Sequence, residues 1–301
     1  HGRAYCGEIF YHDLDVPTQV LEAQPPIAER LDLSQVLSWL KPRAQDAYKN
    51  QFGHVLVVGG DYGMPGAVRM VGETAARAGA GLVTVATRPE HVPAIVAARP
   101  ELMCYGIQDA SDLEPLFKRA TVIVLGPGLG RSDWSKELFA CVMQSELPLV
   151  VDADALYWLE QFELSRDNWI LTPHPGEAAR LLQTANHLIQ EQRLAALGML
   201  QLQYGGVVVL KGSGTLVHGA SRLPRLCVDG NPGMATGGMG DVLSGLIAAF
   251  VAQSIPLEEA AQLGVLLHAQ AADKAALRYG QRGLLARDLL PELRRLVNPY
   301  H

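Results

Sequence analysis

The chain has 301 residues, of which 49% are hydrophobic and 19% are charged, and its formal net charge is −6. This composition suits a well-filled core, either in one large α/β domain or in two small domains. Because the chain is acidic, lacks a basic run and has no apolar run of membrane-spanning length, it favours neither nucleic acid nor a membrane as a partner.

The four cysteines lie far apart in the sequence, at Cys6, Cys104, Cys141 and Cys227. Their spacing is not that of metal ligands, and scattered reduced thiols are typical of cytoplasmic proteins. The N-terminal residues also lack a signal-peptide pattern. We therefore expect a cytoplasmic protein.

The first part of the chain does not resemble the start of a domain. Residues 8–17 predict one strand, and Pro17, Pro25 and Pro26 then indicate a linker. From this pattern we expect residues 1–30 to be the tail of a preceding domain plus a linker, and a chain that begins with His1 rather than Met is consistent with a fragment. Residues 31–301 would form the next domain, beginning with a short helix within residues 31–40.

From Gly53 onward, predicted strands and helices alternate, which is typical of a layered α/β fold. A helix is expected at residues 67–78, and residues 257–296 should be mostly helical. Several strands are continuous apolar runs, so helices should cover both faces of the sheet. The predicted strands are residues 54–58, 82–86, 121–125, 147–151, 169–171 and 207–210, the last forming a hairpin with residues 215–217.

Glycine and polar residues follow most of these strands directly. In open α/β sheets, ligands bind at the carboxyl ends of the strands, so the segments that follow the strands predict a binding site at that edge. These segments are residues 59–67, 126–130, 152–154, 172–177 and 211–215.

The most informative stretch runs from Asp229 to Phe250, where five glycines precede Asp241 and an apolar run follows. A glycine-rich turn that opens onto a helix leaves backbone N–H groups free to bind an anion such as phosphate. A carboxylate beside a phosphate site can deprotonate a hydroxyl that attacks phosphorus. Asp is also a common residue at helix starts, so the sequence leaves a purely structural role open.

Three further segments also admit two interpretations each. Residues 211–215 form either a simple hairpin turn or a phosphate-binding loop with Lys211 as the counter-charge. His174, held between two prolines, favours a ligand contact, whereas Glu177 either caps the next helix or holds Mg²⁺ through water. Asp152 and Asp154 suit helix caps better than a metal site.

Taken together, six motifs resemble the ADP-dependent NAD(P)H-hydrate dehydratase family, a member of the ribokinase-like superfamily. The resemblance extends over roughly residues 35–298, and the motifs occur in the family's order. They are Gly59-Gly60 with Gly66-Ala67, Gly126-Pro-Gly-Leu-Gly130, Asp152-Ala-Asp154, Thr172-Pro-His-Pro-Gly-Glu177, Lys211-Gly-Ser-Gly-Thr215 and Asn231-Pro-Gly-Met-Ala-Thr-Gly-Gly-Met-Gly-Asp241.

The resemblance implies a three-layer α/β/α sandwich with a central, mostly parallel sheet, and repair of hydrated NADH or NADPH with ADP as co-substrate and Mg²⁺. It also implies a homo-oligomer and a preceding NAD(P)H-hydrate epimerase domain, whose last strand the segment through Pro17 resembles. By position, Asp241 would be the catalytic base and would contact the substrate. Ala67, Gly128 and His174 would bind the hydrated dinucleotide, and Lys211, Gly212, Ser213, Gly214, Thr215 and Gly240 would bind the adenine nucleotide.

Two alternative functions fit the same motifs. A ribokinase-like kinase for a vitamin precursor or a sugar would use Asp241 in the same way. However, many such kinases have Asn where this chain has His174, and that departure favours the dehydratase. The other alternative is a nucleotide sensor without turnover.

Overall fold

The computed structural model covers residues 1–301 and describes all of them except 1–5, 7–9, 11, 163, 220–222 and 300–301. One sheet runs through the molecule in the strand order β1-β10-β9-β8-β7-β6-β5-β2-β3-β4. The strands are β1 (Glu29–Arg30), β2 (His54–Val58), β3 (Leu82–Thr87), β4 (Met103–Gly106), β5 (Val122–Leu125), β6 (Leu149–Val151), β7 (Trp169–Leu171), β8 (Val207–Leu210), β9 (Thr215–His218) and β10 (Arg225–Cys227).

Most neighbouring strands are parallel, and the pairs β8–β9 and β9–β10 are antiparallel. The helices are α1 (Thr18–Glu22), α2 (Leu33–Leu37), α3 (Pro65–Arg77), α4 (Val92–Ala98), α5 (Glu114–Phe117), α6 (Asp133–Met143), α7 (Asp154–Phe162), α8 (Pro175–Leu181), α9 (Asn186–Glu191), α10 (Arg193–Tyr204), α11 (Met239–Ala252), α12 (Leu257–Tyr279) and α13 (Leu289–Leu296).

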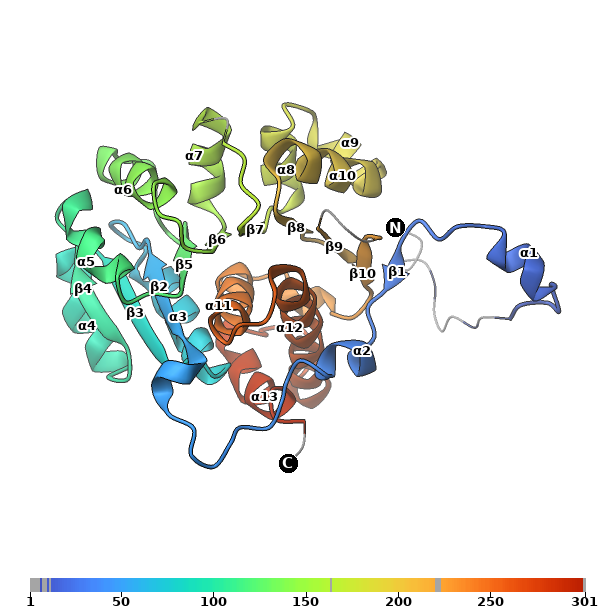
Figure 1. The fold of residues 1–301 in the computed structure, drawn as a ribbon, viewed down its shortest axis with the longest axis horizontal. Coiled ribbons are helices and arrows are strands. Elements are labelled where there is room, and N and C mark those ends of the chain that lie inside the picture. The colour runs from blue at the N-terminus through green and yellow to red at the C-terminus, as the bar shows by residue number, and fades with distance from the viewer. Residues whose placement is uncertain (1–5, 7–9, 11, 163, 220–222, 300–301) are drawn as a thin grey trace.

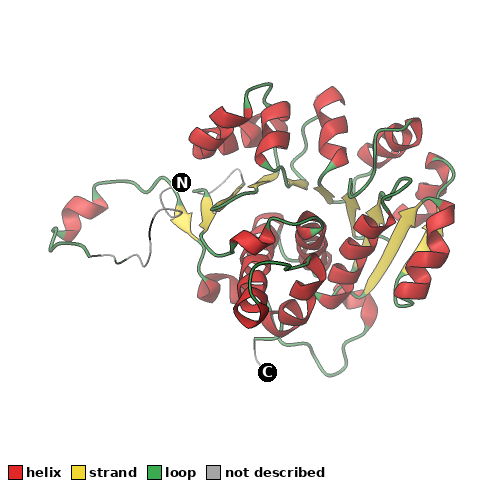
Figure 2. Cartoon of the chain, turned by 180° about the vertical axis from the view of Figure 1, so that it is seen from behind, coloured by secondary structure: helices red, strands yellow, loops and turns green. Residues whose placement is uncertain are grey.

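Both faces of the sheet are buried under helices, and since successive side chains of each strand point to opposite faces, each strand contributes to two cores. Val55 and Val57 of β2 join a core with α3, α11, α12 and α13, whereas Leu56 and Val58 join a second core with α6, α7, α8 and α10. Figures 1 and 2 show these two groups of helices on opposite sides of the strands. The predicted three-layer α/β/α sandwich with a mostly parallel sheet is confirmed.

The predicted strands with continuous apolar runs agree most closely with the strand bounds in the structure. Residues 54–58, 169–171 and 207–210 match β2, β7 and β8, and the hairpin of β8 with β9 is confirmed. The strands β1, β4 and β10 were missed. Each is short and has partly exposed residues, so the alternation of apolar residues is weak.

The strand predicted at residues 8–17 is wrong wherever the structure describes it, and residues 8, 9 and 11 lie outside the described part. Leu14 and Asp15 have positive φ values of 53° and 56°, which a strand does not allow. The helix α1 follows directly and buries none of its residues, and Figure 1 shows it away from the sheet. The proposed boundary at residue 30 stays a prediction, although Glu29 and Arg30 pair with β10 of the main sheet.

Two features show that α11 is buried and packs closely against α3. Its residues are almost all buried from Met239 to Ala252. At Gly245, an added Cβ would lie 2.4 Å from the carbonyl oxygen of Val71, so α11 and α3 approach each other closely. Within the part of the chain that the structure describes, no helix combines the length and the apolar character needed to cross a bilayer.

Candidate active site

The glycine-rich stretch ends where α11 begins, as the sequence predicts. Gly238 precedes the helix with φ 88°, in the left-handed region where a side chain would be strained. An added Cβ there would also lie 2.7 Å from Sδ of Met70 on α3. Gly238 therefore lets the backbone turn sharply into α11, whose first N–H groups have no partner within the helix.

A side chain of α12 holds the loop that leads to this turn. Asp273 accepts hydrogen bonds from the backbone N–H of Gly230 at 2.9 Å and from Nδ2 of Asn231 at 2.8 Å. Asn231 in turn accepts from the N–H of Gly233 at 3.0 Å. The glycine-rich loop is thus tied to a long buried helix before it reaches Gly238.

A buried ion pair lies beside the first turn of α11. Lys211 Nζ donates to Asp152 Oδ1 at 2.8 Å, and Ser244 Oγ donates to Asp152 Oδ2 at 2.7 Å. An added Cβ on Gly240 would lie 3.4 Å from Asp152 Oδ2 and 3.5 Å from Lys211 Nζ. Gly240 therefore lies next to this pair. Because both oxygens of the Asp152 side chain bond to Lys211 and Ser244, the expectation that Asp152 serves as a helix cap is wrong.

Asp241 lies in the first turn of α11 with this pair as its electrostatic neighbour. Burial, together with the negative charge of Asp152, raises the pKa of Asp241 to about 7, against the opposing effect of Lys211. For Lys211, burial would lower the pKa, but the carboxylates of Asp152 and Glu177 outweigh burial and raise it. At neutral pH the site therefore contains a protonated lysine and a carboxyl group poised to gain or lose a proton.

His174 and Glu177 form a reciprocal cap at the start of α8. The N–H groups of Gly176 and Glu177 donate to Nδ1 of His174 at 3.0 and 3.3 Å, and Glu177 Oε2 accepts from the N–H of His174 at 2.7 Å. Because Nδ1 accepts, the imidazole is neutral and carries its proton on Nε2. The capping role considered for Glu177 is thus confirmed, and His174 caps the same helix.

The cap still faces the ion pair. Glu177 Oε2 lies 3.8 Å from Lys211 Nζ, and burial raises the pKa of Glu177 to about 7 although Lys211 opposes the shift. His174 remains 55% exposed, and burial and Lys211 lower its pKa. The half-exposed ring can therefore meet a ligand, and its Nε2 lies 3.5 Å from Oε1 of Glu177.

The loop of residues 211–215 joins β8 to β9 and lies against the segment before α8, since Lys211 N donates to Pro173 O at 2.9 Å. Arg193 of α10, which sequence reasoning missed, holds the loop through its backbone. Its guanidinium donates to the carbonyl oxygens of Leu210 at 3.1 Å and Gly214 at 3.0 Å. Gly212 and Gly214 have φ values of 140° and 77°, so both glycines are needed for this turn.

Ala67 and Gly128, predicted to bind the substrate, are neighbours. Gly128 has φ 58°, and an added Cβ would lie 3.2 Å from Cβ of Ala67 and 2.8 Å from Cβ of Met64. The two loops are joined by a hydrogen bond from Asp61 N to Gly128 O at 2.6 Å. The glycines allow the loops after β2 and β5 to pack backbone against backbone.

The two groups of predicted residues are connected through the segment after β6. An added Cβ on Gly126 would lie 1.8 Å from Asp152 O, and Gly130 N donates to Asp154 Oδ2 at 2.9 Å. All predicted residues therefore lie along one edge of the sheet, while their individual roles stay predictions. A separate cavity of about 730 Å³ between α2, α12 and α13 is lined by none of them.

A family model described as NAD(P)H-hydrate dehydratase matches residues 55–295. The chain is 54% identical over 296 residues to the bifunctional NAD(P)H-hydrate repair enzyme of Coxiella burnetii, a match that covers 98% of this chain and 61% of that protein. The chain thus spans about three fifths of the length of this relative.

Two solved structures are similar throughout. A ribokinase-like superfamily protein from Enterococcus faecalis superposes with a TM-score of 0.84 at 30% identity, covering 98% of this chain and 99% of that one. The ADP/ATP-dependent NAD(P)H-hydrate dehydratase of Bacillus subtilis, crystallised with ATP and Mg²⁺, gives 0.79 at 26% identity, covering 91% and 99%. With the fold, the glycine-lined helix start and the match over residues 55–295 agreeing, the chain belongs to the NAD(P)H-hydrate dehydratase family.

Proposed function

We propose that the chain uses ADP to dehydrate the hydrated nicotinamide ring of NADH or NADPH hydrate. The β-phosphoryl group of ADP passes to the ring hydroxyl and AMP leaves. The ring nitrogen lone pair then expels phosphate to give an iminium, and loss of a proton from the neighbouring ring carbon reforms the ring double bond. The balance is ADP plus hydrate giving AMP, phosphate and the reduced nicotinamide nucleotide, and hydroxide never has to leave as such.

The observation that carries this proposal is the position of Asp241. Its pKa of about 7 leaves a substantial ionised fraction at neutral pH, and it lies at the start of α11, where backbone N–H groups favour an anion. The base would take the proton of the attacking hydroxyl while the N–H groups after Gly238 stabilise the charge on the transferring phosphoryl group.

The other predicted residues divide between the two ligands. Lys211, Gly212, Ser213, Gly214, Thr215 and Gly240 would bind ADP, with Lys211 countering its phosphate charge. Ala67, Gly128 and His174 would bind the hydrated dinucleotide. In this arrangement the ion pair with Asp152 keeps the ammonium group of Lys211 at the phosphates.

The site suits Mg²⁺ only if phosphate oxygens and water supply most of the ligands of the ion. Among the residues that the structure describes, no three His, Cys, Asp or Glu side chains are grouped to hold a metal. Both oxygens of Asp152 are already bonded. Since Mg²⁺ keeps most of its waters and prefers phosphate oxygens, it would be held by the ADP phosphates and, through water, by Glu177, and it would neutralise phosphate charge.

The reaction can be followed by absorbance. Purified protein with ADP and hydrated NADH should restore the near-ultraviolet absorbance of NADH and release equal amounts of AMP and phosphate. A stable phosphorylated hydrate without restored absorbance would indicate a kinase instead. Tight ADP binding without any turnover would indicate a nucleotide sensor.

Three further properties belong to the same proposal. A cytoplasmic location suits the four cysteines, which are all free thiols. An epimerase domain ahead of residue 30 would agree with the bifunctional name of the Coxiella burnetii relative. A homo-oligomer is the assembly we expect, and sedimentation of the purified chain would test it.

A further inference from the structure

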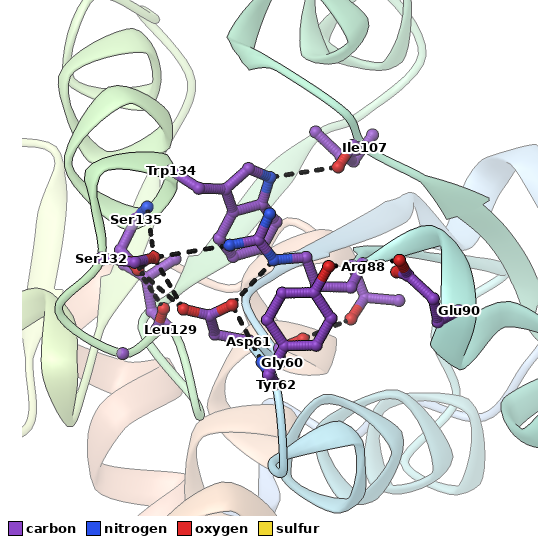
Figure 3. Close-up of polar contacts among 12 residues, drawn as sticks. Gly60, Asp61, Tyr62, Arg88, Glu90, Ile107, Leu129, Ser132, Trp134 and Ser135 are labelled. Carbon is purple, nitrogen blue, oxygen red and sulfur yellow. Dashed lines mark hydrogen bonds and ion pairs between the residues drawn. The ribbon is translucent and has the colours of Figure 1, made fainter.

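A second group of interacting side chains lies around the loop after β2 (Figure 3). Arg88 Nε, from the loop after β3, donates to Asp61 Oδ1 at 2.7 Å, and Ser132 Oγ, before α6, donates to Asp61 Oδ2 at 2.7 Å. Asp61 thereby fixes the loop that contains Met64 and leads to Ala67, next to Gly128. The loop forms a rigid border of the proposed dinucleotide pocket.

Tyr62 is held by this group from several directions. The guanidinium of Arg88 lies 4.6 Å from the centre of the Tyr62 ring and 4.1 Å from the ring of Trp134, so it stacks between them. Tyr62 OH donates to Glu90 Oε1 at 3.1 Å, and the ring of His91 meets it edge-on at 6.1 Å. The phenol ring is therefore fixed in place by a cation, an acceptor and a neighbouring ring.

This fixed ring is nevertheless 60% exposed to solvent. An aromatic side chain that is held by its neighbours and still presents apolar surface is a ready stacking surface, because little conformational entropy is lost when a ligand covers it. Bases stack on such rings with a gain of about 1–3 kcal/mol per base.

The strand order indicates which base could reach it. Four strand spacings separate β8, which precedes the ADP loop, from β2, which precedes Tyr62, or roughly 19 Å at about 4.8 Å each. The loop after β6, whose Asp152 lies next to Gly240, is only two spacings from β2, roughly 10 Å. With the hydrated ring at Asp241 and ADP on the β8 side, the rest of a dinucleotide must extend past Gly128 and Ala67 toward β2.

We propose that Tyr62, stacked on Arg88 and anchored through Asp61 and Glu90, binds the adenine ring at the far end of the hydrated dinucleotide. The inference rests on the proposed function and deepens it, since it assigns a residue that recognises the adenosine half of the substrate. Tyr62 makes no contact with the reacting atoms in this account. It contributes to binding and not to the chemical steps.

The test compares two hydrated substrates that differ only in the adenosine half: hydrated NADH and hydrated reduced nicotinamide mononucleotide. Tyr62→Ala should raise KM for hydrated NADH about tenfold, as loss of one stacked base predicts, with kcat within about twofold. KM for the mononucleotide and KM for ADP should not change. Tyr62→Phe keeps the ring and should behave like the wild type.

Tyr48→Ala is the matched control, because Tyr48 is also 60% exposed but precedes β2, at the other end of that strand. An unchanged KM for hydrated NADH in Tyr62→Ala, an equal rise for both substrates, or a loss in kcat alone would overturn the proposal. If the wild type dehydrated neither substrate, the proposed function itself would fail. Fluorescence titration with NADH, in the presence of saturating AMP, would then still show whether Tyr62→Ala weakens dinucleotide binding.

Discussion

Lys211 Nζ lies 2.8 Å from Asp152 Oδ1 although 58 residues separate the two in the chain, and this pair is in contact distance of Gly240 at the start of α11. The loops after β6 and β8 and the first turn of α11 are thus joined by one interaction. Asp152 is almost fully buried, with 2% of its side chain exposed, so its charge depends on the lysine.

Replacing Lys211 by Met should therefore destabilise the fold as well as the site. The variant leaves a buried carboxylate without its counter-charge, and breaking such a pair costs about 3 kcal/mol or more. Urea unfolding at pH 7 would measure the loss. Lys211→Met combined with Asp152→Asn should recover much of the stability, because the asparagine carries no charge and can still accept from Ser244. Equal stability of Lys211→Met and the wild type would show that Asp152 is not charged in the folded protein.

The activity should depend on pH through Asp241. Its pKa is raised to about 7, and only the ionised form can accept a proton, so kcat/KM should fall about tenfold for each pH unit below 7. Glu177 also has a pKa raised to about 7, mainly by burial. The pH profile of Glu177→Gln separates the two groups, since its midpoint should stay near 7 if Asp241 is the base.

The same shift has a consequence for stability with the opposite sign to that of most carboxylates. Because the pKa of Asp241 is higher in the folded state than its ordinary value of 3.8, the folded state keeps the proton between about pH 4 and pH 7. Raising the pH through this window therefore lowers the free energy of unfolding. Asp241→Asn should remove this loss and be more stable than the wild type at pH 8, and lower stability there would contradict the burial of a charge at this position.

Two adjacent glycines give a matched test of the turn before α11. Gly238→Ala forces a side chain into the left-handed region, which costs about 1–2 kcal/mol, and brings Cβ against Met70. At Gly237 an added Cβ meets no atom within 4 Å. Thermal unfolding and turnover of the two variants should therefore differ: Gly238→Ala loses stability and most activity, and Gly237→Ala stays close to wild type. Similar behaviour of the two would mean that the turn is not set by Gly238.

The parts of the fold that were predictable from the sequence are those whose residues form a recognisable local pattern. The buried runs of β2 and β8 and the glycine-rich turn before α11 are visible in the sequence itself. By contrast, β10 contains Arg225 and Cys227 and exists because it pairs with β9 and β1. A three-residue strand of this kind cannot be recognised from its own residues, because it forms only by pairing with neighbouring strands.

The same distinction applies to the site. The predicted segments do meet at one edge, because parallel strands place their carboxyl ends together. The residues that were missed act over long distances in the chain: Ser244 bonds to Asp152 across 92 positions, and Arg193 bonds to backbone carbonyls of a loop 17–21 residues away. Carbonyl oxygens are present at every residue, so no side-chain pattern could have indicated the partners of Arg193.

The central claim is that Asp241 is the base for phosphoryl transfer from ADP, and the most direct measurement is the turnover of Asp241→Asn with ADP and hydrated NADH, alongside calorimetric titration of ADP. We expect turnover to fall by about 10²–10⁴ while the Kd for ADP changes by less than about threefold. Near-normal turnover in this variant, with ADP bound as before, would contradict the account.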